Sequence, residues 1–244
     1  MFFDRMRYEL RLMGKRVILT PILVMVGFAL FAELLHYLHT DPARFLSGGL
    51  EIILPLAAGV VIATITSHDP VIEVQLTVPK LYHLTVLLRL FLIVIWTACI
   101  ALLSSSALSA LKLVYMLQPA SPWSTPLQFL LRQLVWSAPL FWFATVGLCL
   151  ALLTRSRSAS GALLCGIWLI EIIFKDFIFS TTWLRPVSLF PTTLVFPSTS
   201  VPQLYFNFWL TSRFEVLVMA LVLLPVGWLL LHNPEGLLKG SSEE

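Results

Sequence analysis

Long apolar runs that carry few charged residues constrain this chain more than any other feature of its sequence. Six such runs occur, approximately at 17–38, 46–67, 84–108, 134–153, 161–179 and 214–231. A helix needs about 20 apolar residues to cross the hydrocarbon of a bilayer, so each run is long enough to span it. No run alternates with period two, which argues against a lipid-facing barrel. The sequence predicts an all-α integral membrane protein with six transmembrane helices.

Composition agrees with a membrane environment and rules out a soluble globular protein. Hydrophobic residues make up 58% of the 244 residues and charged residues only 12%, whereas soluble domains carry about 25% charged residues. The formal net charge of +3 is spread thinly along the chain. Nucleic-acid binders need a basic patch interleaved with aromatic residues, and none is present. We therefore expect the lipid bilayer as the surroundings and no nucleic acid as a partner.

Basic residues mark one side of the predicted bundle. Lys and Arg beside transmembrane helices are retained on the cytoplasmic side. They precede the first run, flank the second connection and occupy the short fourth connection: Arg5, Arg7, Arg11, Lys15, Arg16, Lys80, Arg89, Arg155 and Arg157. The opposite connections are longer or nearly neutral, and the first has only Arg44 against Asp41. This asymmetry predicts a multi-pass protein of the plasma or inner membrane, with both termini cytoplasmic, a short tail at 232–244 and an outward-facing segment at 181–203.

The first 16 residues form an amphipathic pattern. Apolar residues recur there at steps of three and four, with charged residues between them, as in a helix that lies in the headgroup plane. Gly14 is the expected bend into the first span. The helix either anchors the chain to anionic lipid or docks its polar face on a cytoplasmic partner.

Two connections have a composition that does not fit a simple loop. The second, 67–89, is too polar to span and too apolar for a solvated loop, so we expect a short interfacial helix that Pro79 ends before it starts the next rising helix. An ordinary linker is the alternative.

The longest connection, 177–213, combines four prolines with many aromatic residues. It predicts a re-entrant or interfacial outer segment before the last helix.

Charged residues inside the predicted spans require an account, above all Glu33, Glu51, Glu171 and Lys175, which map to the outer halves of their spans. Each costs about 2.5–3.5 kcal/mol at the centre of a membrane, so each requires a partner or a role. Glu171 precedes Lys175 by four residues, the favourable order for a helical ion pair, and we expect a structural pair. Contact of Glu51, Glu171 and Lys175 with a substrate is the alternative.

Three tryptophans, Trp96, Trp142 and Trp168, lie near mid-span instead of in the aromatic belts. They either pack in the core or line a path for an amphipathic substrate.

Motifs for enzymes and metal sites are missing. The three cysteines, Cys99, Cys149 and Cys165, lie in apolar runs without metal-ligand spacing and are expected to pack. No zinc-protease, P-loop or dinucleotide-binding motif occurs. The stretch 158–161 has only a faint similarity to the serine motif of rhomboid proteases, because it lacks the leading glycine and a nearby histidine. The chain is therefore expected to catalyse no reaction and to bind no metal or cofactor.

The assembled features resemble the type-2 ABC transporter permeases, the membrane subunits of ABC-2 exporters. An amphipathic helix at 2–15 precedes six spans. The stretch 73–79, EVQLTVP, followed by LLR at 87–89, resembles the family pattern of an acidic residue, a Leu/Thr stretch, a proline and a basic residue. The Pro-rich and aromatic-rich outer segment lies where the family has short re-entrant helices.

This resemblance implies a noncatalytic permease that works with separate subunits. Two copies of an ABC ATPase would bind ATP and Mg, and a second permease copy or a sister permease would complete the path. The export of an amphipathic or hydrophobic drug, peptide, lipid or glycan would proceed by alternating access. The residues implied in coupling to the ATPase are Asp69, Glu73, Gln75, Thr77, Pro79, Arg7 and Arg11. The rival reading is an ATP-independent secondary transporter or channel that uses the buried carboxylates.

Overall fold

The structure is a computed structural model that describes residues 2–39, 42–67, 79–111, 124–194 and 203–231. These residues are helical almost throughout and contain no strand, which confirms the predicted all-α class. The elements are α1 (Phe2–Tyr37), α2 (Ala43–Gly48), the π-helical turn η1 (Gly49–Ile53), α3 (Leu54–Ser67), α5 (Pro79–Ala110), α6 (Thr125–Thr154), α7 (Arg157–Ile173), α8 (Lys175–Ser180), the 3-10 helix η2 (Thr182–Val187), α9 (Pro191–Leu194) and α10 (Gln203–Leu231).

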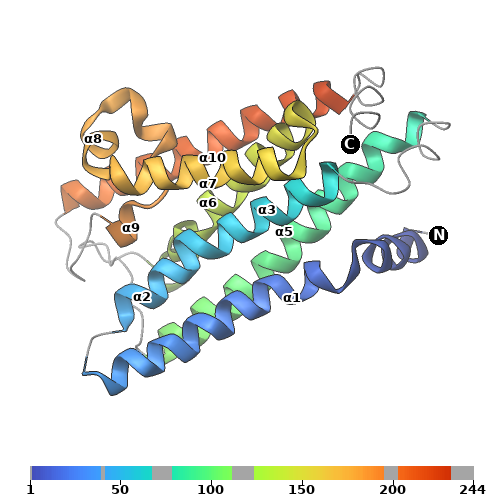
Figure 1. Cartoon of the computed structure of the whole chain (residues 1–244). Helices are drawn as coiled ribbons and strands as arrows, with labels where there is room; N and C mark the ends of the chain where they lie inside the picture. Colours follow the sequence, from blue (N-terminus) through green and yellow to red (C-terminus); the bar gives the residue numbers. More distant parts are fainter. Residues whose placement is uncertain (1, 40–41, 68–78, 112–123, 195–202, 232–244) are drawn as a thin grey trace.

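The long helices lie side by side in one elongated bundle (Figure 1). Helix α6 is central, because it packs against α3, α10, α7 and α5. Helix α1 covers α5 and α3 on one side, while α7 and α10 lie on the other. The start of α1 and the end of α10 lie at the same end of the bundle, and the short helices α2, α8 and α9 lie at the opposite end.

Five helical stretches in the described residues are long and apolar enough to cross a membrane: Met13–Tyr37, Ala43–Thr66, His83–Ala110, Pro126–Thr154 and Phe206–Leu231. They indicate an integral membrane protein. The remaining predicted span, 161–179, is interrupted at Phe174, whose φ of −100° and ψ of 21° separate α7 from α8. Helix α7 therefore contains only 17 residues, and the prediction of one continuous helix over this run is wrong.

Two helices extend beyond the apolar runs that predicted them as spans. Helix α6 begins at Thr125 and α10 at Gln203, each well before its apolar run. An apolar run ends at a charged residue, but a helix can continue through it, and in α10 the charge has a partner. Arg213, placed by the sequence in the last connection, lies inside α10 for this reason, as described below.

Two sequence predictions about helix geometry are confirmed. Gly14 interrupts α1 with a φ of 75° and a ψ of 175°, so the N-terminal part bends away from the spanning part. Only glycine adopts such a backbone conformation without steric cost. Pro79 is the first residue of α5, where its missing N–H leaves no helical hydrogen bond unmade.

Two facing glycines bring α3 and α6 into backbone contact. A Cβ on Gly147 would lie 2.6 Å from the carbonyl oxygen of Gly59, and a Cβ on Gly59 would lie 2.8 Å from the carbonyl oxygen of Phe143. Membrane helices associate largely through such close packing, because lipid provides no hydrophobic force between them. The α3–α6 contact therefore requires that both positions lack a side chain.

Replacing Gly147 by alanine should destabilise the protein, because the new methyl group meets the backbone of α3, which cannot move aside as a flexible side chain can. We expect a cost of about 1–3 kcal/mol. Gly166→Ala is the matched control, since a Cβ there meets nothing within 4 Å, and a helical Gly→Ala change should gain roughly 0.5–1 kcal/mol. Thermal unfolding in detergent measures both variants. Equal melting temperatures would contradict the proposed backbone contact.

Candidate functional site

Glu51 lies in the π-helical turn η1, and Pro55 explains why the turn forms. Pro55 has no N–H to donate to the Glu51 carbonyl four residues earlier, and its ring crowds that carbonyl. The backbone widens here, so the N–H of Leu54 donates to the carbonyl of Gly49, five residues earlier. Single π-turns inside α-helices are frequent at functional sites. This turn places the Glu51 carboxylate against α9 and α10.

The Glu51 carboxylate accepts hydrogen bonds from three residues. The backbone N–H of Thr192 donates to Oε1 at 3.1 Å, and that of Thr193 donates to Oε2 at 2.6 Å. The Thr193 hydroxyl also donates to Oε2, while Nη2 of Arg213 donates to Oε1 in an ion pair. The side chains of Glu51 and Arg213 are 0% exposed. The carboxylate is thus fully surrounded by donors inside the protein.

Glu51, Arg213 and Glu171 form what we call the charge cluster. Arg213 also connects it to the segment of η2 and α9. Its Nη1 donates to the carbonyl of Leu189 at 2.6 Å, and its Nη2 donates to the Thr192 hydroxyl at 3.2 Å. That hydroxyl accepts a further hydrogen bond at 2.9 Å from the indole N–H of Trp209, over which the guanidinium also lies. One arginine therefore joins α10 to Glu51 and to the backbone before α9.

Glu171 is the second carboxylate of the cluster. Its Oε1 accepts a hydrogen bond from the N–H of Leu189 at 2.8 Å, and it lies close enough to interact electrostatically with Arg213 and Glu51. Glu171 lies in α7 and Lys175 begins α8, so the helix is interrupted between the two residues of the predicted ion pair. The bond from Leu189 connects Glu171 across the bundle, and the ion pair with Lys175 stays a prediction.

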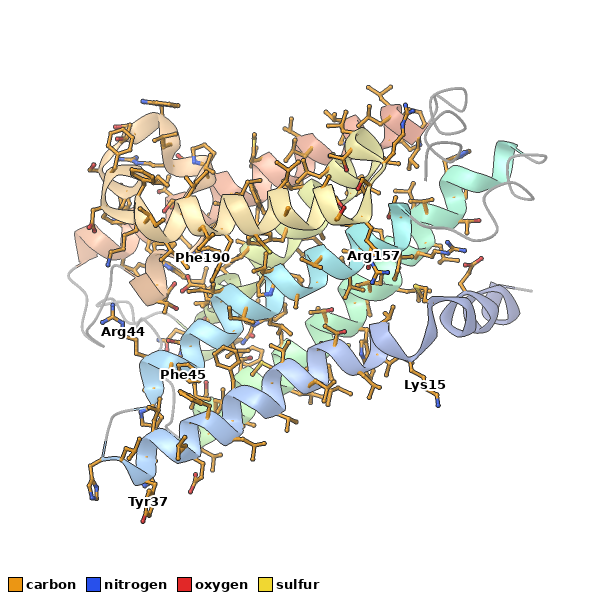
Figure 2. All side chains as sticks on the ribbon, viewed as in Figure 1. Lys15, Tyr37, Arg44, Phe45, Arg157 and Phe190 are labelled. Carbon is orange, nitrogen blue, oxygen red and sulfur yellow. The ribbon has the colours of Figure 1, made fainter. Side chains whose placement is uncertain are left out.

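Further contacts hold the segment of η2 and α9 in place. Nε of Arg44 donates to the carbonyl of Thr193 at 3.1 Å, which links α2 to α9. The ring of Phe190 stacks on Phe143 of α6 with the ring centroids 6.0 Å apart. Figure 2 shows Arg44 and Tyr37 at one end of the bundle and Lys15 and Arg157 at the other. The charge cluster thus belongs to the end away from Lys15.

The charge cluster fastens helices together and presents no open binding site. Buried ions must be paired and hydrogen-bonded, and these groups bond to each other and to backbone. With no exposed surface, neither Glu51 nor Arg213 contacts a cargo in this conformation. Among the described residues, no group of three His, Cys, Asp or Glu side chains could hold a metal ion.

A second buried ion pair lies near the opposite end. Nε of Arg89 in α5 donates to Oε2 of Glu9 at 2.7 Å, and both side chains are less than a tenth exposed. Glu9 belongs to the amphipathic part of α1, ahead of the bend at Gly14. The pair therefore fixes the predicted interfacial helix to the first third of α5.

A cleft of about 500 Å³ lies between α5 and α10, with α6 as its floor. Its walls include Leu84, Phe91 and Val94 of α5 and Leu224 of α10, and its floor includes Ala144 of α6.

None of the three mid-span tryptophans lines this cleft. Trp96 donates its indole N–H to the carbonyl of Ile18 at 3.1 Å, which links α5 to α1. Trp142 and Trp168 both belong to an apolar cluster around α3, α6 and α7. A role of these tryptophans in a substrate path stays a prediction.

The coupling residues implied by the resemblance lie mostly beyond what can be described. Asp69, Glu73, Gln75 and Thr77 fall outside the described residues, and of Arg7 and Arg11 only the helical backbone is described. Pro79 begins α5.

Sequence reasoning missed Arg213 and Glu9. Arg213 was placed in a connection because charges are costly in lipid. A buried Glu51 nevertheless requires a counter-charge, and this requirement was the available signal. Glu9 was one polar residue among several on an amphipathic helix, and only its long-range contact with Arg89 distinguishes it.

Comparison of the chain with family models, with curated proteins and with solved structures finds no match. The functional argument therefore depends on the residues themselves.

Arg213→Met should strongly destabilise the protein, because it leaves the Glu51 carboxylate buried without its counter-charge. Breaking a buried pair in this way costs about 3–5 kcal/mol. The double change Glu51→Gln with Arg213→Met should recover much of that loss, since no unpaired charge then remains at the pair.

The control for this prediction is Arg185→Met, which removes a partly exposed arginine that lies over Phe208 and should cost about 0.5–1 kcal/mol. Thermal unfolding of the purified variants measures all three. A double variant as unstable as Arg213→Met alone would show that charge pairing does not hold this end together.

Proposed function

We propose that this chain is the noncatalytic, membrane-spanning permease subunit of an ATP-driven exporter of the ABC-2 type. Its cargo would be amphipathic or hydrophobic, and ATP and Mg would be bound by two copies of a separate ATPase. A second permease copy or a sister permease would complete the path. The single observation that carries the proposal is the buried Glu9–Arg89 pair.

The pair supports coupling because of where it lies along the chain. Arg89 is ten residues into α5, or about 15 Å from its start at 1.5 Å per residue. The proposed coupling segment, 69–83, includes the first residues of α5, which begins at Pro79. A force on this segment or on the N-terminal helix would move both together, because their ion pair is buried and costly to break.

The membrane topology of the proposal has six crossings, with α7 and α8 together as the fifth. Helix α7 packs against α3 and α6, which supports this reading despite the break at Phe174. The segment of η2 and α9 reaches Glu51, eight residues after the start of α2, or about 12 Å at 1.5 Å per residue. That depth supports a re-entrant outer segment.

Alternating access requires two packings with different affinities for the ATP-bound partner. In this conformation the charge cluster holds α3, α9 and α10 together at the proposed outer end. We infer that this end is closed here and that export requires the cluster to loosen. Proton or ion relay by Glu51 gains little support, because donors already surround its carboxylate.

The experiment that tests the function starts from the gene next to that of this chain, which we expect to encode an ATPase without membrane spans. The full chain is then purified together with that ATPase. We expect a stable complex that hydrolyses ATP. Failure of any ATPase to associate would favour the ATP-independent transporter or channel instead.

In that complex, Glu9→Gln or Arg89→Leu should lower cargo-stimulated ATP hydrolysis several-fold, because the interfacial helix is no longer fixed to α5. The charge swap Glu9→Arg with Arg89→Glu should restore part of it. Lys15→Ala, at an exposed position on the same helix, is the control and should behave as wild type. Unchanged stimulation in folded Glu9→Gln would remove the pair from the coupling route.

The topology is tested by impermeant thiol labelling of single cysteines in a background without native cysteines. Cysteine at Ser156, between α6 and α7, should be labelled from the cytoplasmic side, and cysteine at Ser200 from the outside. The reason is that Ser156 lies next to Arg157, at the same end of the bundle as Lys15, and basic residues are retained on the cytoplasmic side. Labelling of both from one side would refute six crossings.

A further inference from the structure

The cleft between α5, α6 and α10 is lined by hydrocarbon. Its α5 wall consists of residues at helical steps from Leu84 to Val94, a face about 15 Å long at 1.5 Å per residue. Thr145 contributes a hydroxyl, but that hydroxyl already bonds to the carbonyls of Phe141 and Trp142 in its own helix, at 3.0 Å each. A ligand here would gain dispersion contacts and little else.

The cleft has an open rim and a closed deep end. Phe91 and Phe141 at the rim are 59% and 43% exposed, whereas Val94 and Ala144 at the deep end are 7% and 1% exposed. The rim lies on helices apolar enough to span a membrane, so the cleft opens sideways into the surrounding hydrocarbon. A hydrocarbon chain that enters from the rim would therefore reach Val94 and Ala144 at the deep end.

Charge excludes an ionic occupant. The lining residues carry no charged group, and Arg89, which lies within the same stretch of α5, is bonded to Glu9 on α1. The ten lining residues are also fewer than the roughly 20–30 that each partner contributes to a stable protein interface, so the cleft by itself is too small to be a dimer interface.

We propose that this cleft binds one acyl chain of a membrane phospholipid, with the end of the chain against Ala144 and Val94. The driving force is packing, because an apolar cleft left empty loses the dispersion contacts of its whole lining. The site does not depend on an ATPase partner, so its test is independent of the proposed export function.

The test uses the full chain in lipid nanodiscs that contain a phosphatidylcholine with a diazirine at the end of one acyl chain. After irradiation, peptide mass spectrometry locates the adducts. We expect adducts at Ala144 and its α6 neighbours, although these residues are buried, in excess over the exposed Leu23 of α1 and Leu221 of α10. Adducts spread over the exposed faces, with α6 unlabelled, would overturn the proposal.

Paired variants test whether the adducts depend on the cleft. Ala144→Leu fills the deep end and should lower the α6 adducts several-fold, whereas Ala107→Leu, the same change at an exposed position of α5, should leave them unchanged. A single size-exclusion peak of Ala144→Leu at the wild-type position controls for misfolding. Undiminished labelling in Ala144→Leu would refute the site. Absent labelling, together with a disulfide between two copies of Phe91→Cys, would assign the cleft to a second copy and also overturn the proposal.

Discussion

The buried ion pair between Glu51 and Arg213 is the interaction on which one end of this bundle, the end with α2, α8 and α9, depends. In lipid, neither charge could be hydrated, so each is tolerable only because the other neutralises it. The pair also bonds to backbone groups of Leu189, just before α9, and of Thr192 and Thr193, within α9. One pair thus explains why α10 continues past an arginine and why short broken helices can lie deep beside α3.

A second buried ion pair lies near the opposite end of the bundle. Glu9 and Arg89 hold the N-terminal helix to α5 across the bend at Gly14. Between the two ends, glycine contacts join α3 to α6 and leave α5 and α10 apart, with the apolar cleft between them. The bundle therefore combines a tightly fastened end with an end that a cytoplasmic partner could move, as the proposed permease function requires.

Several elements followed from local sequence alone. The apolar runs predicted the spanning helices, Gly14 predicted the bend, and Pro79 predicted the start of α5. One error has a clear physical cause. Reading a charge as the end of a span placed Arg213 in a loop. This treated charge as a local property, whereas a buried charge can be neutralised by a partner far away in the sequence.

The sequence by itself determined that the chain is helical, that it is apolar enough to enter lipid and that basic residues mark one side. These properties depend on composition and on spacing within one helix. Only the tertiary structure decided which charges meet, since Glu51 and Arg213 are 162 positions apart. It likewise decided that Trp96 packs against α1, apart from the cluster that contains Trp142 and Trp168. It also decided that an apolar cleft remains beside α6. Such features arise from how helices pack, which spacing along one helix does not specify.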